Sequence, residues 1–314
     1  MEIINSDHFS QFDGETVATI GFFDGVHAGH RYLLEQLKTK ANDRNLPSMV
    51  ITFLQHPQTV LQAGFQPDLL STYHERVERL SFSGIDYCLL LNFTGMLSGM
   101  NARDFIQKKL HKEWKVKLLV IGYDHRFGKN RSEGFEDYVK YGNECGLEII
   151  QASEFPDMQI SSTLIRNCLL DNNLQEANRL LSYCYRLEGK IIKGNRFGRE
   201  IGFPTANLDV QDKNKIIPGE GVYAAGVYRG QKKYGGMVYI GKRPTLMNHG
   251  EPRIEVHLFD FSGDLYDETL QLEFIGFLRG SKKFENFAEL KKQLFADREA
   301  AIKVLGITCK SCGN

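Results

Sequence analysis

The chain has 314 residues, enough for about two domains, and its 42% hydrophobic and 25% charged residues are ordinary for a globular protein. Lys+Arg and Asp+Glu both number 39, so the formal net charge is zero, which argues against a nucleic-acid partner or a charge-driven one. The N-terminus lacks a signal-peptide pattern and no run of about 18 apolar residues occurs, so we expect a cytoplasmic protein with no membrane contact.

The first half of the sequence alternates in period between residues 17 and 152. Short apolar runs are separated by helical patterns such as HRYLLEQLKTKA, DFIQKKLHKE and FEDYVKYGNE. This alternation predicts an α/β domain with a doubly wound, Rossmann-like parallel sheet covered on both faces. The predicted strands are VATIG (17–21), SMVITF (48–53), DYCLLLNF (86–93), KLLVIG (117–122) and LEIIQA (147–152).

The texture of the sequence changes near Tyr185. Two helical patterns fill 161–182, and short alternating strands separated by Gly and Pro follow them, which is typical of an antiparallel barrel or sandwich. Residues 284–306 read as one long amphipathic helix. We therefore predict two domains, 1–183 and 184–314. The predicted strands of the second are YRLEGKIIK, GVYAAGVYR, KYGGMVYIG, RIEVHLFD and TLQLEFIG.

The cysteines predict neither a disulfide framework nor a metal site. Four are scattered singly and read as reduced thiols, and Cys309 and Cys312 form a lone CxxC in the tail. A structural zinc needs about four ligands and no second pair exists, so we expect a tail without metal. The single cysteines are Cys88, Cys145, Cys168 and Cys184.

The segment GFFDGVHAGH (21–30) carries the sharpest local signal. His27 and His30 are spaced i, i+3 at the start of a helix that follows a strand and a glycine turn. A helix N-terminus suits phosphate, and two imidazoles there can donate hydrogen bonds to a phosphorus transition state. The alternatives are a surface cap and a pair of zinc ligands.

This segment resembles the nucleotidylyltransferase signature of the prokaryotic bifunctional riboflavin kinase/FAD synthetase family, and nine further segments resemble that family in the right order. Departures include His125 where the family usually has Phe, Leu54–Gln55, Tyr239 and Gly280–Ser281. The matching segments are TFLQHP (52–57), LST (70–72), VIGYDHRFGKNR (120–131), ISSTLIR (160–166), GREIGFPTAN (198–207), PGEGVY (218–223), YIGKRPT (239–245), IEVHLFDF (254–261) and FLRGSKKF (277–284).

For the first domain the resemblance implies adenylyl transfer from ATP to FMN. His27, His30 and Arg166 are the catalytic candidates. Asp124 and Arg126 follow an apolar strand, where ligands of parallel sheets bind, although a salt bridge between them is an alternative. A plain helix cap with a salt-bridging arginine is the alternative for SSTLIR, and a structural turn histidine for His56. The remaining nucleotide-binding candidates are Gly21, Phe23, Asp24, Gly29, Ser162 and Thr163.

For the second domain the resemblance implies phosphorylation of riboflavin by ATP. Thr205 and Asn207 would bind Mg²⁺, and Glu255 would be the general base that accepts the ribityl hydroxyl proton. Glu255 alternates with Ile254 and Val256, so it points away from them; an exposed strand acid is the alternative. Further ligand-binding candidates are Gly194 and Arg199 in a glycine-rich turn, which could also be a plain barrel turn, and Arg279, whose guanidinium can stack on a flavin.

Three functions compete at this point. The first is the bifunctional flavin enzyme, with riboflavin, FMN and ATP as small-molecule substrates, Mg²⁺ as cofactor, and a monomer or weak homo-oligomer as its state. The second is a nucleotidylyltransferase with another acceptor and a non-catalytic barrel, which leaves PTAN and Glu255 without a role. The third is a flavin-binding protein without turnover, which leaves two phosphate-handling segments unexplained.

Overall fold

The computed structural model describes residues 1–6, 14–62, 64–123, 125–129, 132–156, 159–194, 198, 202–242 and 252–308. The chain divides into two compact units, Met1–Ser162 and Thr163–Asn314. The expected tail cysteines, Cys309 and Cys312, lie outside the described residues, as do Asp124 and Arg199. The four single cysteines are free thiols, as expected.

The first unit is built on a six-stranded sheet in which every pairing is parallel, as predicted. Its order is β1-β4-β3-β2-β5-β6, so the chain moves outward from β2 in one direction and then returns to β5 on the other side. The edge strand β1 was not predicted from the sequence, since it is only four residues long. The strands are β1 (Glu2–Asn5), β2 (Thr16–Ile20), β3 (Ser48–Phe53), β4 (Tyr87–Leu91), β5 (Val116–Ile121) and β6 (Glu148–Gln151).

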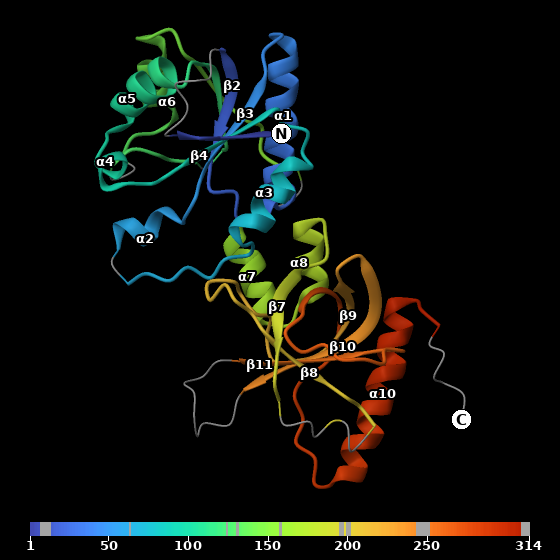
Figure 1. The fold of residues 1–314 in the computed structure, drawn as a ribbon. Helices are drawn as coiled ribbons and strands as arrows, with labels where there is room; N and C mark the ends of the chain where they lie inside the picture. Colours follow the sequence, from blue (N-terminus) through green and yellow to red (C-terminus); the bar gives the residue numbers. More distant parts are fainter. Residues whose placement is uncertain are drawn as a thin grey trace. The chain divides into compact units, whose positions relative to one another are not determined.

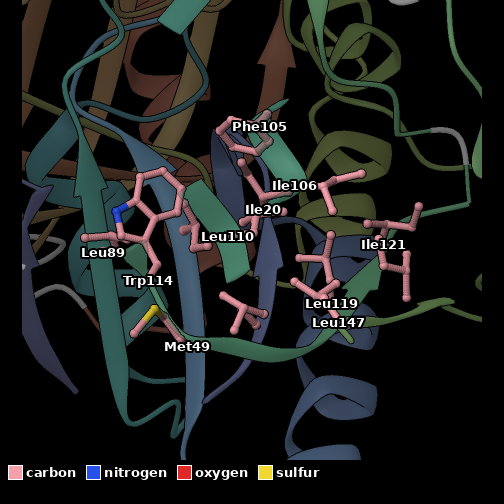
Figure 2. Packing of buried hydrophobic residues seen from close by; sticks show 14 of the residues in the cluster. Ile20, Met49, Leu89, Phe105, Ile106, Leu110, Trp114, Leu119, Ile121 and Leu147 are labelled. Atoms are coloured by element: carbon pink, nitrogen blue, oxygen red, sulfur yellow. The ribbon is translucent and has the colours of Figure 1, made fainter. Parts of the chain in front are cut away.

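Alternate residues of the central strands enter two different cores, because successive side chains of a strand point to opposite faces. Val50 packs with α1 (Ala28–Asp43) and α3 (Tyr73–Ser81) on one face, whereas Met49 and Ile51 lie on the other. Figure 2 shows the second core, where Trp114 lies beside Met49 and Leu89. Both faces of the sheet are therefore covered, which explains why its strands are almost wholly apolar.

The second core is covered by a helix that begins as α5 (Ala102–Asp104) and continues in π-helical form as η3 (Phe105–Glu113). It lies beside α6 (Phe135–Asn143) in Figure 1. The sequence predicted a helix here but not its π-helical hydrogen bonding. Two short helices, α2 (Pro57–Leu61) and α4 (Gly95–Ser98), follow β3 and β4, and the 3₁₀ turn η2 (Asp24–Val26) precedes α1.

The second unit contains a closed barrel of six antiparallel strands in the order β10-β11-β8-β7-β12-β9. The predicted antiparallel barrel is confirmed, with one strand more than the five expected. The additional strand is β8, which is short and begins with the last two residues of the predicted GREIGFPTAN segment. The strands are β7 (Arg186–Ile192), β8 (Ala206–Asp209), β9 (Gly221–Arg229), β10 (Lys232–Lys242), β11 (Pro252–Leu258) and β12 (Thr269–Arg279).

Helices α7, α8 and α10 accompany the barrel (Figure 1). The long helix α10 (Phe287–Leu305) packs on the barrel, where Ala301 enters a core with Phe203, Met237 and Phe259. Helices α7 (Ser162–Leu170) and α8 (Leu174–Leu181) are amphipathic, and the Asn178 amide donates to the Phe274 carbonyl of β12 at 2.9 Å. The contact-based division thus falls after Ser162, whereas the sequence texture changes near residue 184. The division into functional domains at 183/184 stays a prediction.

None of the helices in the part of the chain described above combines the length and apolar character needed to cross a membrane.

Candidate active sites

The strand order of the first unit creates a topological switch point between β2 and β5, because β2 leads to β3 on one side and β5 lies on the other. In open parallel sheets ligands bind at the carboxyl ends of the strands at such a point. The loops that leave β2 and β5 hold most of the candidates for adenylyl transfer, namely residues 21–30 and 122–127. The fold therefore brings together segments that lie about a hundred residues apart in the sequence.

The turn after β2 has an unusual backbone. Phe23 and Val26 have φ values of 58° and 40°, and Gly25 between them has φ 76°. A positive φ is a genuine outlier for a β-branched residue, and such strain is concentrated at functional sites. Phe23 is buried and its ring meets the His30 ring edge-on, with centroids 5.2 Å apart. The turn thereby fixes how the next helix begins.

The two histidines lie together, as the sequence predicted. His27 is the N-cap of α1, and its Nδ1 accepts a hydrogen bond from the His30 backbone N–H at 3.3 Å. The two imidazoles are stacked, with centroids 3.6 Å apart and planes 18° apart. Because Nδ1 of His27 accepts this hydrogen bond, the neutral imidazole carries its proton on Nε2.

His30 is held neutral by its surroundings. Burial, followed by the nearby imidazoles of His27 and His125, holds its pKa well below the ordinary value of 6.5. Its Nδ1 atom is buried and has no hydrogen-bond partner. His125, in the loop after β5, is thus close enough to His30 to oppose its protonation. His125 was noticed in the sequence as a departure from the family, not as a neighbour of His30.

Asp24 is committed to the neighbouring LST loop. Its buried carboxylate accepts from the backbone N–H groups of Leu70 at 3.0 Å and Ser71 at 3.1 Å, and from the Ser71 hydroxyl at 3.3 Å. The Ser71 hydroxyl in turn accepts from the Gly25 N–H at 2.9 Å. These contacts tie the carboxyl end of β2 to the loop before α3. A nucleotide contact of Asp24 stays a prediction, as it does for Gly21, Phe23 and Gly29.

Arg76 of α3 is a residue that the sequence analysis missed. It is 1% exposed, its guanidinium donates to the Phe53 and Leu54 carbonyls at the end of β3, and it lies 4.1 Å from the Phe22 ring centroid. Burial lowers its pKa to about 10, an effect that the Asp24 charge opposes. The sequence of this helix contains several charged residues, and nothing in it distinguishes one arginine as buried. The burial of Arg76 follows only from its hydrogen bonds to the carbonyls at the end of β3.

The start of α7 holds the remaining candidates of the first half. Within the first unit, the Ser162 hydroxyl donates to the Asp24 carbonyl at 3.2 Å, so this serine is attached to the turn after β2. Thr163 is exposed and Arg166 half-buried, and both belong to the second unit.

Two further candidates lie in loops of the first unit. Arg126 is exposed in the loop after β5. His56 caps α2, its Nδ1 accepting from the Gln58 N–H at 3.2 Å, which fits the structural alternative.

The second unit contains a cavity of about 1000 Å³. The residues that line it come from all six strands of the barrel, the segments between them and α10, and they include every described candidate of the riboflavin kinase half. A cavity of this size holds a cofactor-sized ligand. The candidates among its lining residues are Gly194, Thr205, Asn207, Glu255 and Arg279.

Four polar side chains form a connected network in this cavity. Glu255 pairs with Asn207 in the β11–β8 register, and the Thr205 hydroxyl donates to Glu255 Oε2 at 2.9 Å. Arg253 Nε lies 2.7 Å from Glu255 Oε1 and donates to Asn207 Oδ1 at 3.2 Å. The structure therefore brings Thr205, Asn207 and Glu255 together, as the sequence predicted, and adds Arg253, which was missed.

Gly194 is required by close packing. A side chain at this position would overlap the Asn207 amide, so only glycine lets the backbone pass there. His257, two residues beyond Glu255, holds the segment from the other side: its Nδ1 lies 2.8 Å from the Pro204 carbonyl. Burial is the main reason that the pKa of His257 is lowered. The segment around Thr205 is thus positioned by two contacts, that of Gly194 with Asn207 and that of His257 with Pro204.

Arg279 reaches the cavity but its charge has a partner. Its Nε and Nη2 bind the buried carboxylate of Asp297 in α10 at 2.8 Å and 2.7 Å, and Asp297 also accepts from Gln293 at 2.8 Å. The guanidinium lies 5.8 Å from the Phe284 ring centroid. A flavin contact of Arg279 stays a prediction. Because Nε and Nη2 of its guanidinium already bind Asp297, the predicted contact would be stacking of the flavin on the flat face of the guanidinium.

No cluster of three or more His, Cys, Asp or Glu side chains suited to a metal ion occurs among the residues described. The zinc alternative for His27 and His30 therefore has no third ligand of these types there. Any metal in the second unit would depend on the mixed hydroxyl, amide and carboxylate oxygens of the cavity.

The fold and the two sites define a class: a transferase with a nucleotidylyltransferase-type sheet and a barrel whose cavity contains a polar network. Comparison with family models agrees, since residues 9–164 match FAD synthetase and 181–305 match riboflavin kinase. The chain belongs to the bifunctional riboflavin kinase/FMN adenylyltransferase family, which makes the first of the three candidate functions the correct one.

Individual relatives match over nearly the whole length. The chain is 37% identical over 313 residues to the bifunctional riboflavin kinase/FMN adenylyltransferase of Escherichia coli strain K12, covering 98% of this chain and 99% of the relative. That of Haemophilus influenzae is 36% identical, with 90% and 92% covered. A crystal structure described as a macrolide-efflux protein from Streptococcus pneumoniae has a TM-score of 0.85 and 31% identity, covering 96% of this chain and 99% of that one.

Proposed function

We propose that this chain phosphorylates riboflavin to FMN in the barrel cavity and transfers AMP from ATP to FMN at the carboxyl end of the parallel sheet. The observation that carries the assignment of the two steps is that each unit has its own cluster of polar side chains suited to phosphate chemistry. The stacked imidazoles belong to the first unit, and the Thr205–Glu255–Asn207 network belongs to the second.

Adenylyl transfer needs little base catalysis, because the attacking FMN phosphate is already an anion. It attacks the α-phosphorus of ATP, and pyrophosphate leaves. His27 and His30 are proposed to stabilise this transition state by donating N–H groups to phosphate oxygens. A lowered pKa keeps His30 neutral at rest, so its buried imidazole carries no charge before the negatively charged substrates arrive. Ser162, Thr163 and Arg166 are proposed to bind the β- and γ-phosphates.

Phosphorylation of riboflavin does need a base, because its ribityl hydroxyl is a weak nucleophile. Glu255 is proposed to accept the hydroxyl proton as the oxygen attacks the γ-phosphorus of ATP and ADP leaves. The hydroxyl of Thr205 and the amide oxygen of Asn207 are hard oxygen donors, and together with nearby phosphates they fit Mg²⁺ better than a softer metal. A magnesium ion bound there would neutralise phosphate charge in the transition state.

Separation of products tests the proposal directly. Full-length enzyme with riboflavin, ATP and Mg²⁺ should yield FMN and then FAD. The His27→Ala variant should stop at FMN, and Glu255→Gln should make no FMN from riboflavin while still converting supplied FMN to FAD. If His27→Ala makes FAD at the unchanged rate, the assignment of the imidazole pair is wrong.

We further propose that the enzyme works in the cytoplasm, as a monomer or a weak homo-oligomer, without a nucleic-acid partner. The zero net charge supports the last point. Light scattering at several protein concentrations measures the oligomeric state.

A further inference from the structure

One face of β11 presents polar side chains to the cavity at every second position. Arg253, Glu255 and His257 all line the cavity, because residues i and i+2 of a strand share a face. The opposite face carries Ile254 and Val256, which are buried. Asn207 of β8 lies directly across from Glu255, so the strands alone bring Arg253, Glu255 and Asn207 together.

Arg253 interacts with both of its neighbours through one nitrogen. Its Nε–H is shared between Glu255 Oε1 at 2.7 Å and Asn207 Oδ1 at 3.2 Å, while the other carboxylate oxygen of Glu255 accepts from Thr205 at 2.9 Å. These three oxygen-bearing residues are the ones proposed to hold the metal or to take the proton. The arginine therefore supplies the positive charge that this oxygen cluster needs.

A guanidinium and a divalent ion cannot both use the Asn207 oxygen in the same way. Magnesium binds oxygen at about 2.0–2.1 Å, so on Asn207 Oδ1 it would lie next to the guanidinium whose Nε–H now contacts that oxygen, and the repulsion between the two positive charges opposes their joint binding. The arginine and glutamate side chains are 32% and 18% exposed. Water can therefore screen this ion pair, so replacing the guanidinium by a divalent cation costs little free energy.

Resting on the function proposed for this cavity, we propose that Arg253 is a positioning residue that acts as an internal substitute for the metal. In the ligand-free enzyme it holds Glu255 and Asn207 in place and competes with the divalent cation for their oxygens. Metal and nucleotide binding moves the guanidinium away, which releases Glu255 to act as the base only when the phosphate donor is present.

Direct metal binding tests this competition. Free Mn²⁺ is measured by electron paramagnetic resonance in the presence of saturating ADP, for the full-length enzyme and for Arg253→Met and Arg253→Gln. The Thr205→Ala/Asn207→Ala double variant is subtracted to isolate the site in the cavity. Both Arg253 variants should bind Mn²⁺ about two- to fivefold more tightly than the unaltered enzyme, the range expected for losing a screened ion pair.

A steady-state measurement complements the binding data. The Mg²⁺ concentration that gives half-maximal FMN formation should fall by the same factor in Arg253→Met, while Arg253→Lys, which keeps the charge, should stay near the unaltered value. Arg229→Met is the matched control, because Arg229 pairs with Glu268 on the same barrel and does not line the cavity. It should change neither quantity.

The outcomes separate this inference from the function on which it rests. If every Arg253 variant that folds binds Mn²⁺ as the unaltered enzyme does, or more weakly, the proposed competition is overturned. If the double variant instead binds Mn²⁺ like the unaltered enzyme and makes FMN normally, the metal site itself is misplaced. Circular dichroism of each variant confirms that the protein measured is folded.

Discussion

At the scale of single residues, His30 links the active site to the stability of the first unit. Its folded-state pKa is lowered, whereas in the unfolded chain it returns to about 6.5. The unfolded state then binds more protons, so the free energy of unfolding should fall as the pH decreases below about 6.5 towards the folded-state pKa. The contribution of neutral, buried His30 to the free energy of unfolding should be fully present above about pH 6.5.

The test uses Trp114, the single tryptophan of the chain, which is buried in the first unit and reports on its unfolding. Urea unfolding followed by its fluorescence should show a smaller loss of stability between pH 7.5 and pH 5.5 in His30→Gln than in the unaltered protein. An equal loss in both proteins would contradict the lowered pKa.

Arg76 gives a prediction about stability alone. Replacing it with Met leaves the carbonyls at the end of β3 buried without a donor and removes a positive charge near Asp24. Such losses cost about 1–3 kcal/mol, so the urea midpoint reported by Trp114 should fall accordingly. Arg44→Met is the control, because its ion pair with Glu148 is exposed and should contribute at most about 1 kcal/mol. Equal effects of the two substitutions would refute this role for Arg76.

The sequence could identify residues whose chemistry is visible in a short segment. His27 and His30 are close in sequence and stack in the structure, and Thr205 and Asn207 belong to one hydrogen-bond network through Glu255 and Arg253. It could not identify Arg76, because that role depends on carbonyls twenty-two and more residues away. The contribution of His125 likewise depends on two loops meeting at the switch point of the sheet.

At the scale of elements, strand alternation predicts more of the cavity lining than Glu255 alone. The period of two that turns Glu255 away from Ile254 also places Arg253 and His257 beside it. Short strands were the weak point: β1 and β8 have four residues each, and both depend on pairing with strands far away in sequence. A pattern of four residues is too short to separate a strand from a turn.

The attachment of α10 to β12 can be tested at Asp297. Its carboxylate is 4% exposed and carries the ion pair with Arg279, so Asp297→Asn leaves a partly buried cation without its counter-charge. We expect a loss of about 3 kcal/mol in the stability of the second unit, measured as faster hydrogen exchange of the α10 amides. Asp267→Asn, whose partner Lys190 is exposed, should leave that exchange unchanged. Unchanged exchange in Asp297→Asn would show that the ion pair does not hold the helix.

At the scale of the whole molecule, the two units should be separable, and a cut after Ser162 should leave a more stable second fragment than a cut before residue 184. Helices α7 and α8 bury apolar side chains within the second unit, and the Asn178 amide oxygen accepts from the Tyr185 N–H at 2.8 Å. A fragment of residues 163–314 should melt cooperatively and make FMN but no FAD. The fragment 184–314 should melt at a lower temperature, because it exposes the barrel surface that these helices cover.

Calorimetry of the two fragments and product separation after incubation with riboflavin and ATP check this prediction. Equal melting temperatures would show that the helices add nothing to the barrel. A folded 163–314 fragment that makes no FMN would show that the kinase site needs residues of the first unit.

The pairing pattern of the barrel also has a consequence for synthesis on the ribosome. The parallel sheet is complete once β6 has emerged, so the first unit can fold while the rest of the chain is being translated. The barrel cannot close so early: β12 is its last strand and pairs with both β7 and β9, so one edge of each of these two strands waits for it. The nascent barrel therefore exposes unpaired edges over about eighty codons, which makes that interval the vulnerable period of its biogenesis.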